Sequence, residues 1–274
     1  MTFAHNGDVE LFYETFGARG DPALLLINGL GSQCINYAEE WCEKFAAEGF
    51  LVIRFDNRDV GLSSKLDDVS YTPSDMAADA VAVLDDVGVD RAHVMGVSMG
   101  GMIVQTLAIE HPDRLLSMTS VMSTTGDADV GNPSDEALRL ILSPPPADRD
   151  AYIARHLESQ RAWGSPAGYD EARLTANAAQ AYDRCFCPEG QARQLTAIVA
   201  SGSRTAALRD VQVPALVLHG DADTLVDPSG GRRTAEAIPG ARFVLIEGMG
   251  HDYPPEHWDR LVSLVTRHAR AATS

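Results

Sequence analysis

Short apolar runs alternate with helical patterns along most of the chain. Continuous apolar runs predict strands that are buried on both faces, at residues 23–28, 50–56, 92–97, 116–122, 215–219 and 242–247. Helical spacing and helix-ending residues predict helices at residues 37–48, 73–87, 98–110 and 256–270. Such alternation predicts an α/β fold, in which a mostly parallel sheet carries helices on both of its faces.

Two regions depart from this rhythm. At the N-terminus, Asn6-Gly7 is a strong two-residue turn signal and predicts a hairpin leading into a strand at residues 9–15. In the middle of the chain, residues 123–212 show helical stretches, three successive prolines and no clear buried strand. We therefore expect a core made of residues 1–122 and 213–274, with residues 123–212 forming a helical cap over one end of the sheet.

The composition narrows the classes of function. The chain has 274 residues, with 22 Lys and Arg against 39 Asp and Glu, so its formal net charge is −17. This acidity argues against nucleic acid and against anionic membrane surfaces as partners. The first 17 residues lack the apolar segment of a signal peptide. We therefore expect a cytoplasmic protein with reduced thiols, at Cys34, Cys42, Cys185 and Cys187.

A candidate nucleophile stands between a predicted strand and a predicted helix. Residues 96–100 read Gly-Val-Ser-Met-Gly, which matches the G-x-S-x-G pattern of a nucleophile elbow. Small neighbours let the backbone turn sharply there and raise the Ser98 hydroxyl above the sheet. The same turn places the N–H of Met99, at the start of the helix, where negative charge would develop in a reaction at Ser98.

A serine nucleophile needs a base. His251 lies in the loop after the last predicted strand, on the same sheet edge as Ser98. His219 also ends a strand at this edge and is the main competitor, whereas we interpret the other six histidines as surface or structural residues. The chain shows no dinucleotide, Walker A or H-E-x-x-H motif, so we expect neither a cofactor nor a metal.

The base needs a carboxylate that fixes its tautomer and stabilises the imidazolium. Three aspartates follow the strand at residues 215–219, namely Asp221, Asp223 and Asp227. Their spacing alone does not choose among them.

A resemblance to the α/β-hydrolase superfamily covers nearly the whole chain. The order Ser98, Asp223, His251 matches that of the superfamily, and residues 219–223 match its H-G-x-x-D segment, which implies Asp223 as the acid. Residues 54–63 and 248–252 resemble the esterase branch that includes aclacinomycin methylesterase. The resemblance also implies an oxyanion hole formed by the backbone N–H groups of Leu30 and Met99. Relatives often carry His-Gly before the first of these donors, and this sequence has Asn28-Gly29.

These features together predict a serine hydrolase that cleaves small to medium apolar esters or methyl esters through an acyl-enzyme on Ser98. The substrate would be a small molecule, and Tyr253 is a candidate for its pocket because it follows His251 closely. The same three residues also serve C–C bond hydrolysis, thioester hydrolysis or acyl transfer, and a ligand-binding receptor on a hydrolase scaffold is the alternative outside enzymes. The sequence leaves the oligomeric state open.

Overall fold

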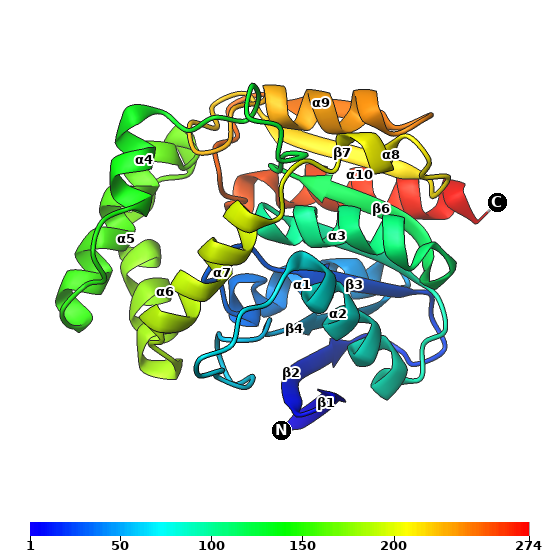
Figure 1. Cartoon of the computed structure of the whole chain (residues 1–274), viewed down its shortest axis with the longest axis horizontal. Coiled ribbons are helices and arrows are strands. Elements are labelled where there is room, and N and C mark those ends of the chain that lie inside the picture. The colour runs from blue at the N-terminus through cyan, green and yellow to red at the C-terminus, as the bar shows by residue number, and fades with distance from the viewer. Residues whose placement is uncertain (274) are drawn as a thin grey trace.

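One eight-stranded sheet forms the centre of the computed structural model, which describes residues 1–273 (Figure 1). The strands are β1 (Thr2–Asn6), β2 (Val9–Phe16), β3 (Ala23–Ile27), β4 (Leu51–Phe55), β5 (Ala92–Val97), β6 (Leu115–Val121), β7 (Ala215–Gly220) and β8 (Arg242–Ile246). Their order in the sheet is β1-β2-β4-β3-β5-β6-β7-β8. All neighbours from β4 to β8 pair in parallel, whereas β2 is antiparallel to both β1 and β4.

Helices cover both faces of this sheet. They are α1 (Glu39–Ala47), α2 (Pro73–Val87), α3 (Met99–Glu110), α4 (Asp135–Ile141), α5 (Arg149–Trp163), α6 (Glu171–Arg184), α7 (Pro188–Ala200), α8 (Thr205–Leu208), α9 (Ser229–Ala237) and α10 (Pro255–Ala272). Leu25 and Ile27 of β3 pack in one apolar cluster with α2 and α3, and Leu24 and Leu26 pack in the other with α1 and α10. Because successive strand side chains point to opposite faces, a strand covered on both sides must be apolar throughout. This confirms the α/β fold predicted from the sequence.

Local hydrogen bonds and one glycine set both ends of α2, and the first hairpin has the turn that the sequence predicts. The Thr72 side chain accepts a hydrogen bond from the backbone of Asp75, whose carboxylate bonds back to the Thr72 N–H. Gly88 ends the helix with φ of 80°, in the left-handed conformation that glycine adopts at little cost. In the hairpin, Asn6 pairs with Val9, so the turn consists of two residues, as expected.

The sequence pattern does not predict helix α9. Its first turn contains Gly230 and Gly231, which have low helix propensity. A Cβ on Gly231 would lie only 2.4 Å from Nδ1 of His219 on β7. The glycine is therefore required by the close approach of the helix to the sheet.

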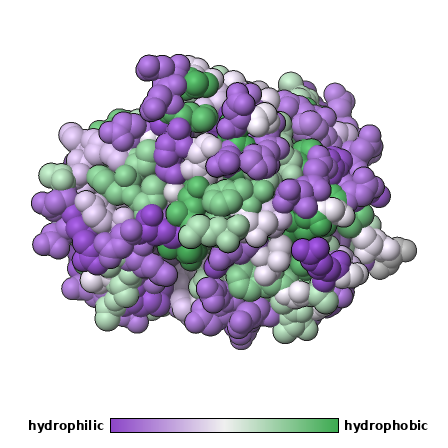
Figure 2. Space-filling view, turned by 90° about the horizontal axis from the view of Figure 1, so that it is seen from below, coloured by the Kyte–Doolittle hydropathy of each residue, from purple (hydrophilic) through white to green (hydrophobic). Residues whose placement is uncertain are grey.

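The four longest helices of the middle region, α4 to α7, lie between β6 and β7 in the chain and to one side of the sheet (Figure 1). Helix α5 packs against both α4 and α6. Helix α7 contacts the core instead, because its Ala197 belongs to the apolar cluster that contains Leu25 and Ile27 of β3. Hydrophobic residues gather near the middle of the face shown in Figure 2 and hydrophilic residues surround them.

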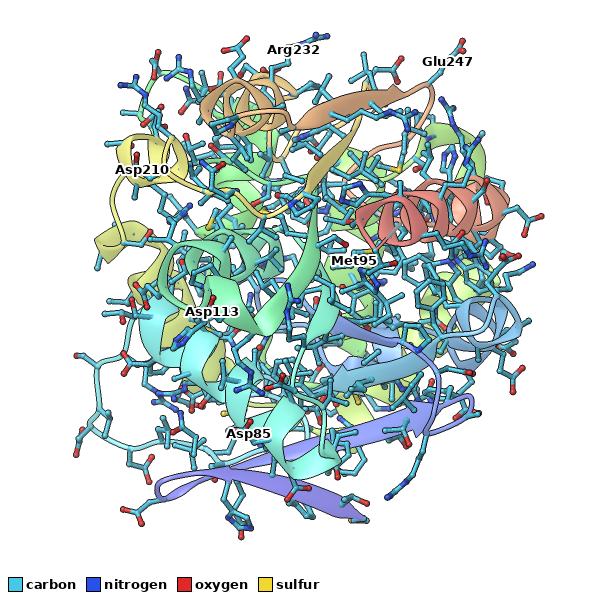
Figure 3. All side chains as sticks on the ribbon, turned by 90° about the vertical axis from the view of Figure 1, so that its right-hand side faces the viewer. Asp85, Met95, Asp113, Asp210, Arg232 and Glu247 are labelled. Atoms are coloured by element: carbon cyan, nitrogen blue, oxygen red, sulfur yellow. The ribbon has the colours of Figure 1, made fainter. Side chains whose placement is uncertain are left out.

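The charged surface agrees with the acidic composition. In Figure 3, Met95 of β5 lies inside the molecule, where it is 1% exposed, whereas the five labelled charged residues are at the exterior. No helix within residues 1–273 combines the length and the apolar character needed to cross a bilayer.

Candidate active site

Ser98 joins β5 to α3 in a strained backbone conformation. Its φ is 57° and its ψ is −119°, and it occupies the N-cap position of α3. Non-glycine residues seldom adopt this conformation, which persists only where the surrounding structure enforces it. The Ser98 N–H donates to the carbonyl of Val121 at the end of the neighbouring strand β6, and the Ser123 hydroxyl donates to the Ser98 carbonyl.

Glycines around Ser98 allow the turn to fit between the strands. A Cβ on Gly96 would lie 2.1 Å from the carbonyl oxygen of Gly100. A Cβ on Gly100 would in turn lie 2.1 Å from the carbonyl oxygen of Ile27, at the end of β3. Both contacts are with backbone that cannot move aside easily, so each of the two glycines of the G-x-S-x-G pattern has a steric reason to lack a side chain.

His251 and Asp223 form a hydrogen-bonded pair at the same sheet edge as Ser98. Nδ1 of His251 lies 2.7 Å from Oδ2 of Asp223. The Asp223 carboxylate is fully buried, and the His251 side chain is 8% exposed. Burial by itself would raise the pKa of Asp223, but the facing His251 and His219 rings hold it at about 2. The ionised carboxylate has no proton to share, so Nδ1 must carry the ring proton and Nε2 is left as the basic nitrogen.

The remaining contacts of Asp223 fix its orientation. Oδ1 accepts the backbone N–H groups of Leu225 and Val226, both at 2.9 Å. Nε2 of the fully buried His219 lies 3.3 Å from Oδ2 of Asp223 and 2.8 Å from the carbonyl oxygen of Val226. His219, the competing candidate for the base, is therefore packed behind Asp223 and away from solvent.

The two other candidate aspartates have local backbone partners. Asp221 accepts the N–H of Gly248 at 2.7 Å, which ties its loop to the one after β8. Asp227 accepts the N–H of Ser229 at 2.9 Å, at the start of α9. Neither bonds to a histidine among the described residues.

The loop after β3 lies directly beside Ser98. A Cβ on Gly29 would be 3.2 Å from the Ser98 Cβ and 3.7 Å from its Oγ. The next residue, Leu30, has a backbone N–H with no hydrogen-bond partner within residues 1–273. Met99 is the first residue of α3, so its N–H has no partner within the helix. Both N–H groups predicted for the oxyanion hole therefore border the turn that holds Ser98.

Side chains from two other elements hold this loop. Nδ2 of Asn57 donates to the carbonyl of Asn28 at 3.1 Å. The buried Gln194 of α7 accepts the N–H of Gly31 at 2.8 Å and donates to the carbonyl of Arg58 at 2.8 Å. Within residues 1–273, the buried side chain of Asn28 has no hydrogen-bond partner on either polar atom.

Ser98, Asp223 and His251 follow β5, β7 and β8, which are parallel, so all three lie at the carboxyl edge of the sheet. In the described part of the chain, no hydrogen bond joins the Ser98 hydroxyl to His251. Hydrogen bonds between catalytic groups are often long before substrate binds. The sequence of the chain from residue 22 to residue 257 matches the alpha/beta hydrolase fold family. The chain belongs to this family.

Curated relatives of this α/β hydrolase include two methylesterases. It is 34% identical to rhodomycin D methylesterase DnrP of Streptomyces peucetius, over 98% of this chain and 97% of that protein. It is 33% identical to rhodomycin D methylesterase DauP of Streptomyces sp. (strain C5), with 97% coverage of both. Among solved structures, the enol-lactonase from Burkholderia xenovorans LB400 has a TM-score of 0.80 and 26% identity, covering 98% of this chain and all of that one. The family and the methylesterases support the expected carboxylic ester hydrolase.

Tyr253, the candidate pocket residue, is part of an aromatic stack in the α/β hydrolase. Its ring lies 5.0 Å from the Trp41 ring and 5.5 Å from the Tyr37 ring, centroid to centroid. Its carbonyl accepts the indole N–H of Trp258 at 2.7 Å. The stack joins the loop that carries His251 to α1 and α10, and a contact of Tyr253 with substrate stays a prediction.

Residues that no sequence pattern reveals hold the His251 loop of this α/β hydrolase. Asp252 is hydrogen bonded to Ser165, which follows α5, and His251 itself is bonded to the carbonyl of Trp163. The sequence marks Asp252 only through its place next to His251, within the segment 248–252 that resembles the esterase branch, and it gives no signal for Ser165. In the described residues, no three His, Cys, Asp or Glu side chains gather as a metal site would require.

Proposed function

We propose that this α/β hydrolase cleaves carboxylic esters with Ser98 as nucleophile, His251 as general base and Asp223 as the group that orients the base. The observation that carries the proposal is the 2.7 Å contact between His251 Nδ1 and Asp223 Oδ2. This contact leaves Nε2 basic, at the sheet edge where the strained turn presents Ser98. Asp221 and Asp227 lack such a contact, which supports the assignment of Asp223.

The reaction then follows from these groups. Nε2 of His251 takes the proton of the Ser98 hydroxyl as its oxygen attacks the ester carbonyl. The resulting oxyanion accepts the N–H groups of Leu30 and Met99, neither of which has a hydrogen-bond partner within residues 1–273. Protonated His251 donates to the leaving alcohol, and water, activated by the same imidazole, hydrolyses the acyl-enzyme.

In the proposal, residues 123–212 act as a cap that selects the substrate, and residues 1–122 and 213–274 form the core. A hollow at the junction of the two is lined by Gly31, Gln33 and Val60 from the core and by Tyr152, Phe186 and Cys187 from the cap region. Tyr152, Tyr182 and Phe186 form an aromatic cluster, with ring centroids 4.8 to 5.8 Å apart. These apolar rings favour small to medium apolar esters, and the methylesterase relatives favour methyl esters among them.

The proposed setting is the cytoplasm, with a small-molecule ester as the partner. All four cysteines lie in the described part of the chain and are free thiols, which suits a reducing compartment. The net charge of −17 suits a neutral or apolar substrate better than a nucleic acid or an anionic membrane surface.

A panel of p-nitrophenyl and methyl esters, varied separately in the acyl and alcohol parts, tests the function together with Ser98→Ala. We expect multiple turnovers by the wild-type protein, loss of at least about 10⁴-fold in kcat for Ser98→Ala, and labelling of Ser98 alone by a fluorophosphonate. Hydrolysis by Ser98→Ala near the wild-type rate would remove Ser98 from the mechanism. A single turnover with a retained adduct would indicate a receptor instead of an enzyme.

A further inference from the structure

The C-terminal end of α5, in the proposed cap, bonds to both loops that carry the proposed acid and base. The carbonyl of Trp163 accepts the backbone N–H of His251 at 2.6 Å. The carbonyl of Ala162 accepts the hydroxyl of Thr224, the residue after Asp223, at 2.7 Å. The last carbonyls of a helix have no hydrogen-bond partners within the helix. Two of these carbonyls in α5 accept hydrogen bonds from the loops that carry Asp223 and His251.

Ser165 and Asp252 extend this contact. The hydroxyl oxygen of Ser165 accepts the N–H of Gly250 at 2.9 Å. Oδ1 of Asp252 accepts both the backbone N–H of Ser165, at 2.9 Å, and its hydroxyl. Only a group that is donor and acceptor at once can make both side-chain bonds, and Ser165 is 2% exposed, so water does not replace it readily.

The backbones meet at close range. A Cβ on Gly250 would lie 2.4 Å from the carbonyl oxygen of Trp163 and equally close to the carbonyl carbon of Gly164. Gly250, His251 and Asp252 each form a hydrogen bond with one of residues 163–165. None of these hydrogen bonds has a partner in the sheet, which the chain leaves at the end of β8. The residue just before Gly250, Met249, is held to the core, because its carbonyl accepts a hydrogen bond from the N–H of Ala222.

We propose that Ser165 and Asp252 form a latch by which the end of α5 positions His251. This inference rests on the proposed function for its catalytic consequence. The Asp223 contact fixes the direction of the imidazole, but the height of the ring above the sheet is set by the backbone of residues 250–252. Opening the latch frees that backbone, so His251 spends less time within reach of the Ser98 hydroxyl. Ser165 and Asp252 are positioning residues that touch neither substrate nor reacting atoms.

The kinetic test compares Ser165→Ala and Asp252→Ala with Asp252→Asn. The two alanine variants should lose at least tenfold in kcat, with KM changed less than twofold, because the proton transfer and not the binding of the ester is impaired. Asp252→Asn keeps Oδ1 as an acceptor for both Ser165 donors, so its kcat should stay within about threefold of the wild-type value. Equal losses in Asp252→Asn and Asp252→Ala would overturn the latch.

A matched control lies at the other end of the same helix. Asp148 accepts the N–H of Ala151 at 2.9 Å as the N-cap of α5, so Asp148→Ala weakens α5 without touching His251. At comparable losses in the free energy of unfolding, Asp148→Ala should keep kcat within about threefold. If Asp148→Ala and Ser165→Ala lower kcat equally, the effect is general destabilisation of the helix and the latch is wrong.

The double variant tests whether the two side chains act as one unit. Ser165→Ala with Asp252→Ala should lose no more than about twice what the worse single variant loses in kcat, because either change already opens the latch. Losses that multiply would show two independent contributions and contradict the proposal.

A proton NMR measurement separates the latch from the proposed function, because it needs no substrate. The His251 Nδ1 proton bonded to Asp223 should give a strongly downfield resonance in wild type, and the resonance should be absent in His251→Gln. It should broaden or vanish in Ser165→Ala while persisting in Asp148→Ala and in Ser98→Ala. An unchanged resonance together with an unchanged kcat in Ser165→Ala would refute the latch, even if Ser98→Ala is inactive. An active Ser98→Ala would refute the proposed function instead. In that case the resonance alone would test the latch.

Discussion

Asp223 uses one carboxylate oxygen for His251 and the other for the backbone of its own loop. Oδ2 lies 2.7 Å from Nδ1 of His251, and Oδ1 accepts the N–H groups of Leu225 and Val226. The side chain therefore has one orientation, and the nature of the atom that faces His251 decides where the imidazole proton resides.

Asp223→Asn should lower kcat by about 10³- to 10⁴-fold with little change in KM. The amide oxygen would replace Oδ1 toward the two backbone donors, so the NH₂ group would face His251. Nδ1 would then have to accept a hydrogen bond, and the ring proton would move to Nε2, where it blocks the base. Steady-state kinetics on a p-nitrophenyl ester measures the effect. Asp221→Asn and Asp227→Asn are matched controls, and a larger loss in either would reassign the acid.

The strain at Ser98 predicts an order of stability among variants. A φ of 57° with ψ of −119° costs a non-glycine residue about 1 to 3 kcal/mol, and glycine avoids this cost but loses some stability through its freer unfolded chain. Ser98→Gly should therefore have a free energy of unfolding about 1 kcal/mol higher than that of Ser98→Ala. Urea denaturation of the two inactive variants is the measurement. A glycine variant less stable than the alanine variant would mean that the turn is not strained.

Gly100 should not tolerate even one methyl group. Its Cβ would meet the Ile27 carbonyl oxygen at 2.1 Å, so Gly100→Ala must push β3 away from α3. We expect a loss of about 3 kcal/mol in the free energy of unfolding, with a loss of activity because Ser98 moves as well. Gly20→Ala is the control, since no atom of residues 1–273 outside its own chain neighbours lies within 4 Å of the added Cβ and its φ is not left-handed. Comparable losses in both variants would rule out the steric explanation.

His93 predicts how stability depends on pH. Burial, assisted by the charge of His268, lowers the pKa of His93 from 6.5 to about 4 in the folded protein. Between these values the unfolded chain binds the extra proton, so the free energy of unfolding falls as the pH drops from 6.5 to 4, by about 3 kcal/mol from this group. In urea denaturation at several pH values, His93→Gln should show a smaller slope over this interval. An unchanged slope would exclude His93 as its source.

The sequence predicts the sheet and Ser98 because their signals are local. A strand covered on both faces must be apolar throughout, as in residues 23–27, and the elbow must be glycine-rich because Gly96 and Gly100 meet backbone. Such constraints act between neighbours in the chain or over whole elements. They are visible as composition within a short window.

The choice of Asp223 and the contacts of Ser165 could not be derived from local pattern. The bond between Asp223 and His251 joins residues 28 positions apart, and that between Ser165 and Asp252 joins residues 87 apart. Nothing in the composition of either segment specifies its partner. Only the resemblance to a known family points to Asp223, and no comparable motif marks Ser165. Helix α9 has no clear sequence pattern for a related reason, since Gly231 meets a steric need set by His219 on β7 and lowers the helix propensity of its own segment.

Strands β6 and β7 are adjacent in the sheet, with Met118 paired to Ala215. The chain therefore leaves and re-enters the scaffold at one seam, and the span between the two strands contributes no strand to the sheet. The entropy of closing such an excursion grows only slowly with its length. Chimeric enzymes can therefore be made at the end of β6 and the start of β7, where a helical segment from another protein would replace the native one and change which esters bind. The new segment would also have to supply hydrogen bonds to the residues that flank His251.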